Sequence, residues 1–284
     1  MRNLLSTKNQ RQLRLMEILI QNRNWMKLHE LADNLGCTER ILKNDLNELR
    51  LAFPSIDIQS SVNGIMIDLE VNTSVEDVYQ YFLANSQSFQ LLEYMFFNEG
   101  LPIYRTLENL HSSNANLYRL GRNITKVLSS QFQIELSFTP SEIRGNEIDI
   151  RYFFAQYFSE RYYFLDWPFP DIPEEDLTEF ADFFYKITNY PMRFSIYRMY
   201  KLMLAISIYR IKNGHFIDLP NHFNEEYYPI LASIPNFEEI LVHFSEKLGL
   251  EITPDIIAQI FISFIQSNIF LDPHGFLQLY RRKP

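Results

Sequence analysis

Apolar residues recur at three- and four-residue spacing through the first fifty positions, which is the period of an amphipathic helix. The spacing predicts three helices, over residues 8–22, 27–35 and 39–53. Gly36 is placed to end the second helix, because glycine readily takes the left-handed conformation found at helix C-termini. Thr38 is a suitable N-cap for the third helix. A helix, a short glycine turn and a capped helix together predict a helix-turn-helix.

The third predicted helix has two distinct faces. Its apolar face is formed by Leu42, Leu46, Leu49 and Phe53. Its polar face is formed by Arg40, Lys43, Asn44 and Asn47. Arg, Lys and Asn are the side chains that reach base edges and phosphates from a helix in the major groove. We therefore expect this polar face, with Thr38 at the helix start, to contact duplex DNA.

Alternating apolar residues lie on both sides of Asn63-Gly64, from Ile56 to Leu69. Alternation around an Asn-Gly pair predicts a β-hairpin with a tight turn. A hairpin after a helix-turn-helix is the arrangement of a wing. Residues 1–71 are thus predicted to be a winged helix-turn-helix domain.

The same pattern returns at a constant offset of 75 residues, without a gap. The matched pairs are Leu28 with Ile103, Leu35 with Leu110, Thr38 with Ser113, Leu42 with Leu117, Leu49 with Ile124, and Phe53 with Leu128. The second candidate DNA-contacting set is Ser113, Asn116, Arg119, Arg122, Asn123 and Lys126. Alternation within 132–145 predicts a second wing, and Ser74 with Asp77 marks the start of a connecting helix. We assign 72–145 to a second winged helix-turn-helix, in which the turn lacks the glycine.

The rest of the chain reads as helical. An aromatic-rich helix is predicted over 146–164, and the proline-rich run from Trp167 to Pro173 cannot continue it. We treat 146–170 as a linker and 171–284 as a helical bundle. The bundle helices are predicted at 173–189, 192–213, 223–233, 236–248 and 254–268. Asn236 with Glu239 resembles a capping box, and Thr253 precedes a first-turn proline. The fold class is mainly α, with two winged units ahead of an all-helical bundle.

Charge is distributed unevenly along this acidic chain, whose formal net charge is −9. Residues 1–53 carry 9 Lys and Arg against 6 Asp and Glu, and residues 101–145 carry 5 against 3. Residues 54–100 carry 7 acidic residues and no Lys or Arg. Local charge decides where a phosphate backbone can dock. The basic blocks coincide with the two winged units, which favours DNA as the partner.

Composition excludes several other classes. The single cysteine, Cys37, excludes an intrachain disulfide framework and a cysteine-based zinc finger, and we expect a small buried filler at this position. No glycine-rich phosphate loop, histidine pair at metal spacing or nucleophile–base set is recognisable. We expect no enzyme activity, cofactor or metal. The N-terminal residues lack the apolar region of a secretory signal, and no stretch is apolar enough to span a bilayer. We expect a cytoplasmic protein without a membrane partner.

The order of these units resembles the Mga/RofA-like family of virulence-gene regulators from Gram-positive bacteria. The resemblance rests on Leu28–Thr38 with its following helix, on the second winged unit, and on the aromatic-rich helical region from about residue 171. It covers essentially the whole chain in architecture, but none of its motifs is as specific as a catalytic signature. Family members usually continue into a second regulation domain and an EIIB-like domain. The resemblance therefore implies that this chain is a truncated or shortened form.

In that family the helical domain is similar to a phosphotransferase-system regulation domain, where histidine phosphorylation tunes activity and dimerisation. The resemblance implies a homodimer and a possible partner in the phosphocarrier HPr. The helix predicted at 192–213 contains no histidine, so His215 and His222 are the candidate phospho-acceptors, in turns where we expect them to be exposed. His243 lies mid-helix beside Phe244, and we expect it to be partly buried. We also expect apolar residues of 254–268, Ile256 and Phe264 among them, to form a dimer contact.

The sequence favours a DNA-binding transcription regulator. Two alternatives remain open. A non-DNA adaptor could use winged units and bundle for protein contacts alone. An enzyme with a winged regulatory front would need a catalytic motif that is not recognisable here.

Overall fold

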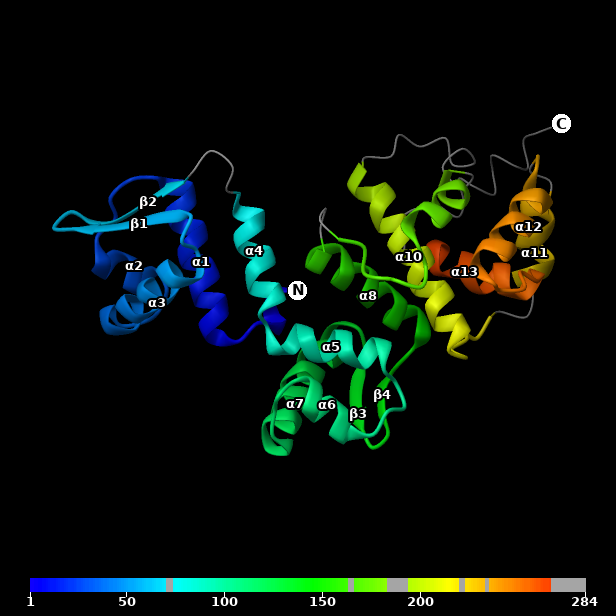
Figure 1. Cartoon of the computed structure of the whole chain (residues 1–284), viewed down its shortest axis with the longest axis horizontal. Helices are drawn as coiled ribbons and strands as arrows, with labels where there is room; N and C mark the ends of the chain where they lie inside the picture. Colours follow the sequence, from blue (N-terminus) through cyan, green and yellow to red (C-terminus); the bar gives the residue numbers. More distant parts are fainter. Residues whose placement is uncertain (70–73, 163–165, 183–193, 220–222, 233–234, 267–284) are drawn as a thin grey trace. The chain divides into compact units, whose positions relative to one another are not determined.

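The computed structural model describes residues 1–69, 74–162, 166–182, 194–219, 223–232 and 235–266. Figure 1 labels the elements in chain order. The chain divides into two compact units. The first comprises Met1–Val127 with Phe138–Glu142, and the second comprises Leu128–Ser137 with the chain from Ile143 onward. Both are mainly helical, which confirms the predicted fold class.

The first helix-turn-helix follows a short 3-10 helix, η1 (Arg2–Leu4). Its helices are α1 (Thr7–Asn22), α2 (Leu28–Asn34) and α3 (Glu39–Ala52). Hydroxyls cap two of them: Ser6 accepts from Asn9 N at 3.1 Å, and Thr38 accepts from Ile41 N at 3.3 Å. Gly36 has a φ of +60°, the left-handed conformation that ends α2 and turns the chain into α3. The predicted helices and the Thr38 cap are confirmed.

The first wing is the antiparallel hairpin of β1 (Ile56–Ser61) and β2 (Gly64–Leu69), with Ile58 opposite Ile67. Met26 adds a β-bridge to Ile65, so the chain before α2 supports one edge of the hairpin. A Cβ at Gly64, where φ is +124°, would lie 2.0 Å from Met26 O. Only glycine permits this close approach.

The second winged unit repeats the first. It is introduced by α4 (Val75–Ala84) and α5 (Gln87–Phe97), and continues through α6 (Ile103–Asn109), α7 (Asn114–Gln131), β3 (Glu135–Phe138) and β4 (Ser141–Arg144). Helix α6 lies 75 residues after α2 at both ends, and α7 starts 75 residues after α3. A capping box of Ser74 and Asp77 starts α4, as predicted. Helix α5 was not anticipated, because apolar residues occupy so much of its surface that no amphipathic stripe stands out.

The second wing packs on its recognition helix through Phe138. The rings of Phe138 and Tyr118 meet edge to face, with centroids 5.3 Å apart. A Cβ at Gly121 would lie 2.4 Å from Cε2 of Phe138. Gly121 therefore creates the space on α7 that receives the wing.

The second compact unit contains the bundle. Its helices are α8 (Glu147–Tyr162), the 3-10 helix η2 (Glu174–Leu177), α10 (Phe194–Lys212), α11 (Phe223–Ala232), α12 (Phe237–Leu248) and α13 (Pro254–Gln266). The sequence predicts a linker helix in the α8 region, whereas α8 packs against α10 and α13. Its Phe153, Phe154 and Phe158 are fully buried. The aromatic stripe of α8 is therefore part of the bundle core.

Several details differ from the sequence-based expectations. Asn236 takes a left-handed φ of 64° and makes no side-chain cap, so the proposed capping box with Glu239 is wrong. The Thr253 cap is confirmed, since its hydroxyl accepts from Ile256 N at 3.3 Å. Helix α13 packs against α8, α10 and α11, and its Phe264 is fully buried. Of the apolar residues expected in a dimer contact, Ile260, Phe261 and Phe264 therefore lie in the interior of the bundle, whereas Ile256 is half-buried.

Within the described ranges, no helix combines the length and apolar character needed to cross a membrane. The same ranges contain no group of three or more His, Cys, Asp or Glu side chains arranged to hold a metal ion.

Candidate nucleic-acid interface

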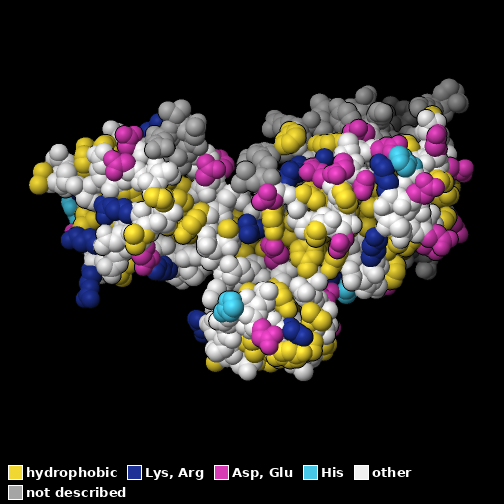
Figure 2. All heavy atoms as spheres, in the orientation of Figure 1, with side chains coloured by type: hydrophobic (Ala, Val, Ile, Leu, Met, Phe, Trp, Pro, Cys, Tyr) yellow, Lys and Arg dark blue, Asp and Glu magenta, His cyan; other side chains and the backbone are white. Residues whose placement is uncertain are grey.

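Helix α3 separates its buried and exposed residues as the sequence predicts. Leu42, Leu46 and Leu49 are at most 2% exposed and pack inward. All four residues of the predicted polar face are exposed, namely Arg40, Lys43, Asn44 and Asn47. The Thr38 hydroxyl is occupied by the helix cap. In Figure 2, Lys and Arg side chains gather over α2 and α3, whereas Asp and Glu are the more frequent charged type over α11 and α12.

A polar network fixes α3 against α1. Asp45 is 2% exposed and accepts hydrogen bonds from Arg11 Nε at 2.6 Å and Gln12 Nε2 at 3.1 Å. Glu48 accepts from Lys8 Nζ at 2.7 Å and from Gln12 Nε2 at 2.7 Å. These two bonds lower the pKa of Glu48, since they stabilise the carboxylate. The network holds the orientation of α3, and the sequence analysis missed it because an acidic residue beside an apolar stripe usually faces solvent.

Arg50 links α3 to the first wing. Its Nε donates to Ile58 O at 3.0 Å, and its Nη2 donates to the hydroxyl of Ser60. Its Nη1 donates to Oδ1 of Asn47 at 3.2 Å. The recognition helix and the β1 strand are therefore held together by one guanidinium group, which the sequence analysis did not single out.

Helix α7 presents a second basic face. Arg119, Arg122, Asn123 and Lys126 are exposed, while Leu117, Ile124 and Leu128 are at most 1% exposed. The Ser113 hydroxyl accepts from Asn116 N at 3.3 Å, the same capping contact that Thr38 makes in the first copy. Asn116 is half-buried: its Nδ2 donates to Ser112 Oγ at 2.9 Å, and its Oδ1 accepts from Arg119 Nη2 at 2.8 Å. Asn116 is thus held by Ser112 through its amide nitrogen and orients Arg119 through its amide oxygen.

The candidate phospho-acceptor His215 lies in the turn after α10. Its backbone N–H donates to Arg210 O at 3.0 Å, and its carbonyl accepts from Arg151 Nη2 at 3.1 Å. The residue is half-buried, where the sequence analysis expected exposure. His222 lies outside the described residues.

His243 is exposed, whereas the sequence analysis expected partial burial. Its neighbour Phe244 is the buried residue and stacks on Phe180, with ring centroids 4.1 Å apart. Successive residues of a helix point about 100° apart, so the two neighbours face different surroundings.

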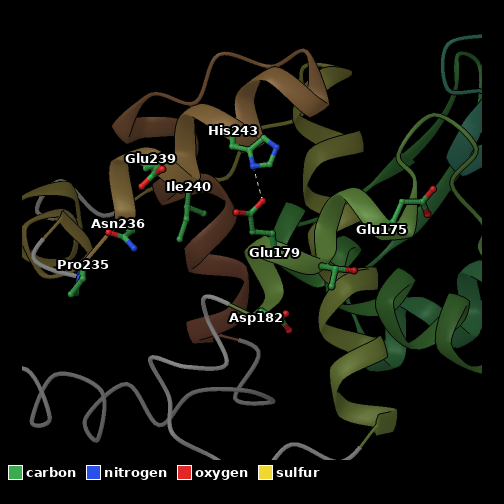
Figure 3. Close-up of a pocket in the computed structure, with 9 residues that line it drawn as sticks. Glu175, Glu179, Asp182, Pro235, Asn236, Glu239, Ile240 and His243 are labelled. Atoms are coloured by element: carbon green, nitrogen blue, oxygen red, sulfur yellow. Dashed lines mark ion pairs between the residues drawn. The ribbon is translucent and has the colours of Figure 1, made fainter.

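The exposed imidazole forms an ion pair that closes one side of an acidic cleft. Nδ1 of His243 lies 2.7 Å from Oε2 of Glu179, and Figure 3 shows the two side chains pointing toward each other. The cleft has a volume of about 730 Å³ and also contains Glu175, Asp182 and Glu239. A phosphoryl group would meet like charge here. The cleft therefore gives no support to His243 as a phospho-acceptor.

A buried charged cluster joins α8 to α10. Arg151 and Arg210 are at most 1% exposed, and both donate to Glu147, with Arg151 Nε at 2.9 Å and Arg210 Nη2 at 2.6 Å. Arg151 Nη1 also donates to Gln259 O in α13 at 2.7 Å. Burial lowers the pKa of Arg151. An i, i+4 Glu–Arg pair is visible in the sequence, but nothing in its spacing shows that it is buried.

Three family models match consecutive parts of the chain. The M protein trans-acting positive regulator (MGA) HTH domain matches residues 6–65, and the Mga helix-turn-helix domain matches 71–158. The MGA PRD domain matches 173–283. The chain belongs to the Mga family. The two helix-turn-helix models coincide with the two copies found at the 75-residue offset, and the matched models describe a regulator and not an enzyme.

Curated relatives agree with this membership. A "Putative trans-acting regulator" of Streptococcus pneumoniae serotype 4 is 41% identical over 283 residues, covering 99% of this chain and 57% of the relative. The "Capsule synthesis positive regulator AcpA" of Bacillus anthracis is 26% identical over 72% of this chain and 43% of its own length. The "Anthrax toxin expression trans-acting positive regulator" of the same organism is 27% identical over 79% and 48%. This Mga-family chain spans about half the length of the curated relatives it matches.

Proposed function

We propose that this chain is a transcription regulator that binds duplex DNA through both winged units. The observation that carries the proposal is the repeated recognition surface. Each copy has a hydroxyl-capped helix with an exposed basic and amide face, followed by a two-stranded wing. Two such surfaces within a chain of net charge −9 concentrate positive charge where a phosphate backbone would lie.

The chemistry of the two faces predicts how DNA is contacted. Lys43 in the first unit and Arg119, Arg122 and Lys126 in the second are exposed cations suited to phosphates. Few groups on either helix can read base edges, so DNA shape and deformability are expected to contribute to site choice. The proposal predicts binding that weakens steeply with salt.

A gel-shift titration tests the proposal against the adaptor alternative. The chain is titrated against a long duplex at two salt concentrations, with heparin-free buffer and a constant pH. DNA binding predicts a retarded complex whose affinity falls as salt rises. An adaptor that uses its winged units only for protein contacts predicts no retarded complex at either salt concentration. Genome-wide mapping of bound DNA in cells would then identify the target promoters.

We further propose that the bundle regulates DNA binding through phosphorylation of His215 by the phosphocarrier HPr. A phosphoryl group would pass from the phosphohistidine of HPr to an imidazole nitrogen of His215, with the displaced proton going to solvent. The turn containing His215 is tied to α8 by Arg151, so added charge there acts close to a structural contact.

Phosphorylation is tested by incubating the chain with HPr, phosphoenolpyruvate and the enzyme that transfers the phosphoryl group from phosphoenolpyruvate to the histidine of HPr, and locating acid-labile phosphate by mass spectrometry. The proposal expects label that is lost in His215→Ala and kept in His243→Ala. Label on His222 alone, or equal label after both His215 and His222 become alanine, would reject His215 as the acceptor.

A cytoplasmic homodimer completes the proposal, since the DNA of a bacterium lies in the cytoplasm and DNA-binding helix-turn-helix proteins commonly pair subunits. Ile260, Phe261 and Phe264 of α13 are at most 1% exposed, so we propose an interface formed by other residues. Sedimentation velocity of the chain over a range of concentrations tests the dimer, and a strict monomer at high concentration would reject it.

A further inference from the structure

Arg50 belongs to α3 but is not part of its exposed basic face. It lies one turn beyond that face and is half-buried. Its guanidinium is shared among three acceptors: the carbonyl of Ile58, the hydroxyl of Ser60 and Oδ1 of Asn47. A guanidinium presents its donors in a fixed planar fork, so three simultaneous acceptors define the positions of all three partners. A group committed in this way is poorly placed to leave and neutralise a phosphate.

The arrangement gives Asn47 a defined polarity. Its Oδ1 accepts from Arg50 Nη1 at 3.2 Å, so the oxygen of the amide faces Arg50. Its Nδ2 makes no hydrogen bond with any described residue, and the side chain is exposed. The outward group of Asn47 is therefore an NH2 donor. Reversing the amide would place that NH2 against the guanidinium and lose a charge-assisted hydrogen bond.

The four bases differ in the hydrogen-bonding groups that their major-groove edges present to an NH2 donor. An asparagine that pairs with adenine uses both amide ends, since it accepts from N6 and donates to N7. Guanine presents two acceptors, N7 and O6, and thymine presents the acceptor O4. An asparagine that can only donate can therefore bind guanine or thymine, but it cannot form the two-bond pairing with adenine.

We propose that Arg50 is a positioning residue that holds Asn47 as a hydrogen-bond donor, so that the first winged unit selects a base acceptor, guanine or thymine, over adenine at one position of its site. This inference rests on the proposed DNA binding of the first unit. It assigns Arg50 no contact with DNA of its own: Arg50 acts through Asn47 and through the β1 strand of the wing.

The second unit supplies a comparison within the same chain. At the 75-residue offset, Arg122 and Thr125 occupy the positions of Asn47 and Arg50. The second unit has no equivalent pair, so the same selection is not expected there. The Arg50–Asn47 pair therefore concerns the first unit alone.

The experiment measures base preference and salt dependence in the full chain. A high-affinity duplex is first selected from a random library with the wild-type protein, and each base pair of the site is then varied. Wild type is expected to disfavour adenine by at least about fivefold at one position. Asn47→Ala should remove that preference. Arg50→Ala and Arg50→Met, which both remove the donor to Asn47 Oδ1, should raise the relative affinity for adenine there, because the amide can turn, while the bases at other positions keep their ranking.

Three controls separate positioning from wing contact, folding and charge. Ser60→Ala removes one wing contact but leaves the Arg50–Asn47 bond, so base preference should persist. Circular dichroism reports whether each variant folds, and an unfolded Arg50→Ala leaves Arg50→Met as the deciding variant. The salt slope of Arg50→Met should equal that of wild type, whereas loss of a phosphate contact flattens it by roughly 0.9.

The outcomes are distinguishable. A wild-type protein that binds no DNA would reject the proposed function and this inference together. Binding with a base preference that neither Asn47→Ala nor the folded Arg50 variants change would reject the inference and leave DNA binding standing. A wild-type preference for adenine at the position governed by Asn47 would also overturn it.

Discussion

Removing the Glu147 carboxylate from the buried cluster is expected to destabilise the second unit strongly. In Glu147→Ala, Arg151 loses its bond at 2.9 Å and Arg210 loses bonds at 3.0 Å and 2.6 Å. Both guanidinium groups stay buried, at no more than 1% exposure, after losing this carboxylate. Breaking a buried ion pair by removing one partner costs about 3–5 kcal/mol. A typical domain is stable by roughly 5–15 kcal/mol, so the variant would lose a large share of its stability.

A triple variant supplies the matched control. Replacing all three charges together, as Glu147→Leu, Arg151→Met and Arg210→Met, removes the Glu147 carboxylate together with the two guanidinium groups that it accepts from. Apolar replacement of a whole buried ionic cluster is often neutral or stabilising. The triple variant should therefore unfold near the wild-type midpoint even though it carries the Glu147 change.

The assay uses the two tryptophans of the chain, which fall one in each unit. Trp25 belongs to the first and Trp167 to the second. In a Trp25→Phe background, Trp167 reports on the second unit alone during urea unfolding. With an m-value of about 2 kcal/mol/M, Glu147→Ala should lower the midpoint by about 2 M. A midpoint within about 0.3 M of wild type, or a triple variant as unstable as the single one, would refute this account of the cluster.

Three further predictions concern other parts of the fold. Gly121→Ala should destabilise the second winged unit by about 1–3 kcal/mol in thermal unfolding, since its Cβ meets Phe138, and adding Phe138→Leu should recover part of the loss. Burial raises the pKa of Cys37, so its reaction with a disulfide reagent at pH 8 should be slower than that of a free thiol, and an equal rate would contradict this. Burial and a hydrogen bond to Asp182 raise the pKa of Tyr197 in the folded protein. The neutral phenol therefore contributes its full stability below about pH 10, and this contribution is lost as pH rises through the folded pKa. The free energy of unfolding of Tyr197→Phe should depend less on pH in the alkaline range than that of wild type.

Features governed by local pattern could be read from the sequence. The caps at Thr38 and Ser74, the hairpin turn before Gly64 and the 75-residue repeat all depend on residues close in the chain, and each has a defined backbone geometry. The exposed polar face of α3 followed from helical period alone. Such features need no knowledge of tertiary contacts.

Features governed by distant contacts could not be read in the same way. Arg151 is separated from Gln259 by 108 residues, and nothing near Arg151 in sequence indicates that it is buried. Nothing near Asp45 in sequence indicates that it is buried beside Arg11 of α1. His243 and Phe244 are adjacent, and only the packing of Phe180 decides which of them is buried. The role inferred for Arg50 likewise depends on the wing strand that folds back onto α3.

The most direct test of DNA binding by both units is the slope of log affinity against log salt concentration for a long duplex, measured by fluorescence anisotropy. Relative to wild type, Lys43→Ala should bind DNA more weakly, with a salt slope flatter by roughly 0.9. The triple change of Arg119, Arg122 and Lys126 to alanine should weaken binding further, with a salt slope flatter by up to about 2.7. Lys247→Ala on α12 removes the same charge from a helix that belongs to neither winged unit, and it should keep the wild-type slope. A triple variant with wild-type affinity and slope would show that the second unit is not a DNA-binding surface, and a wild-type chain that binds no DNA at low salt would contradict the account as a whole.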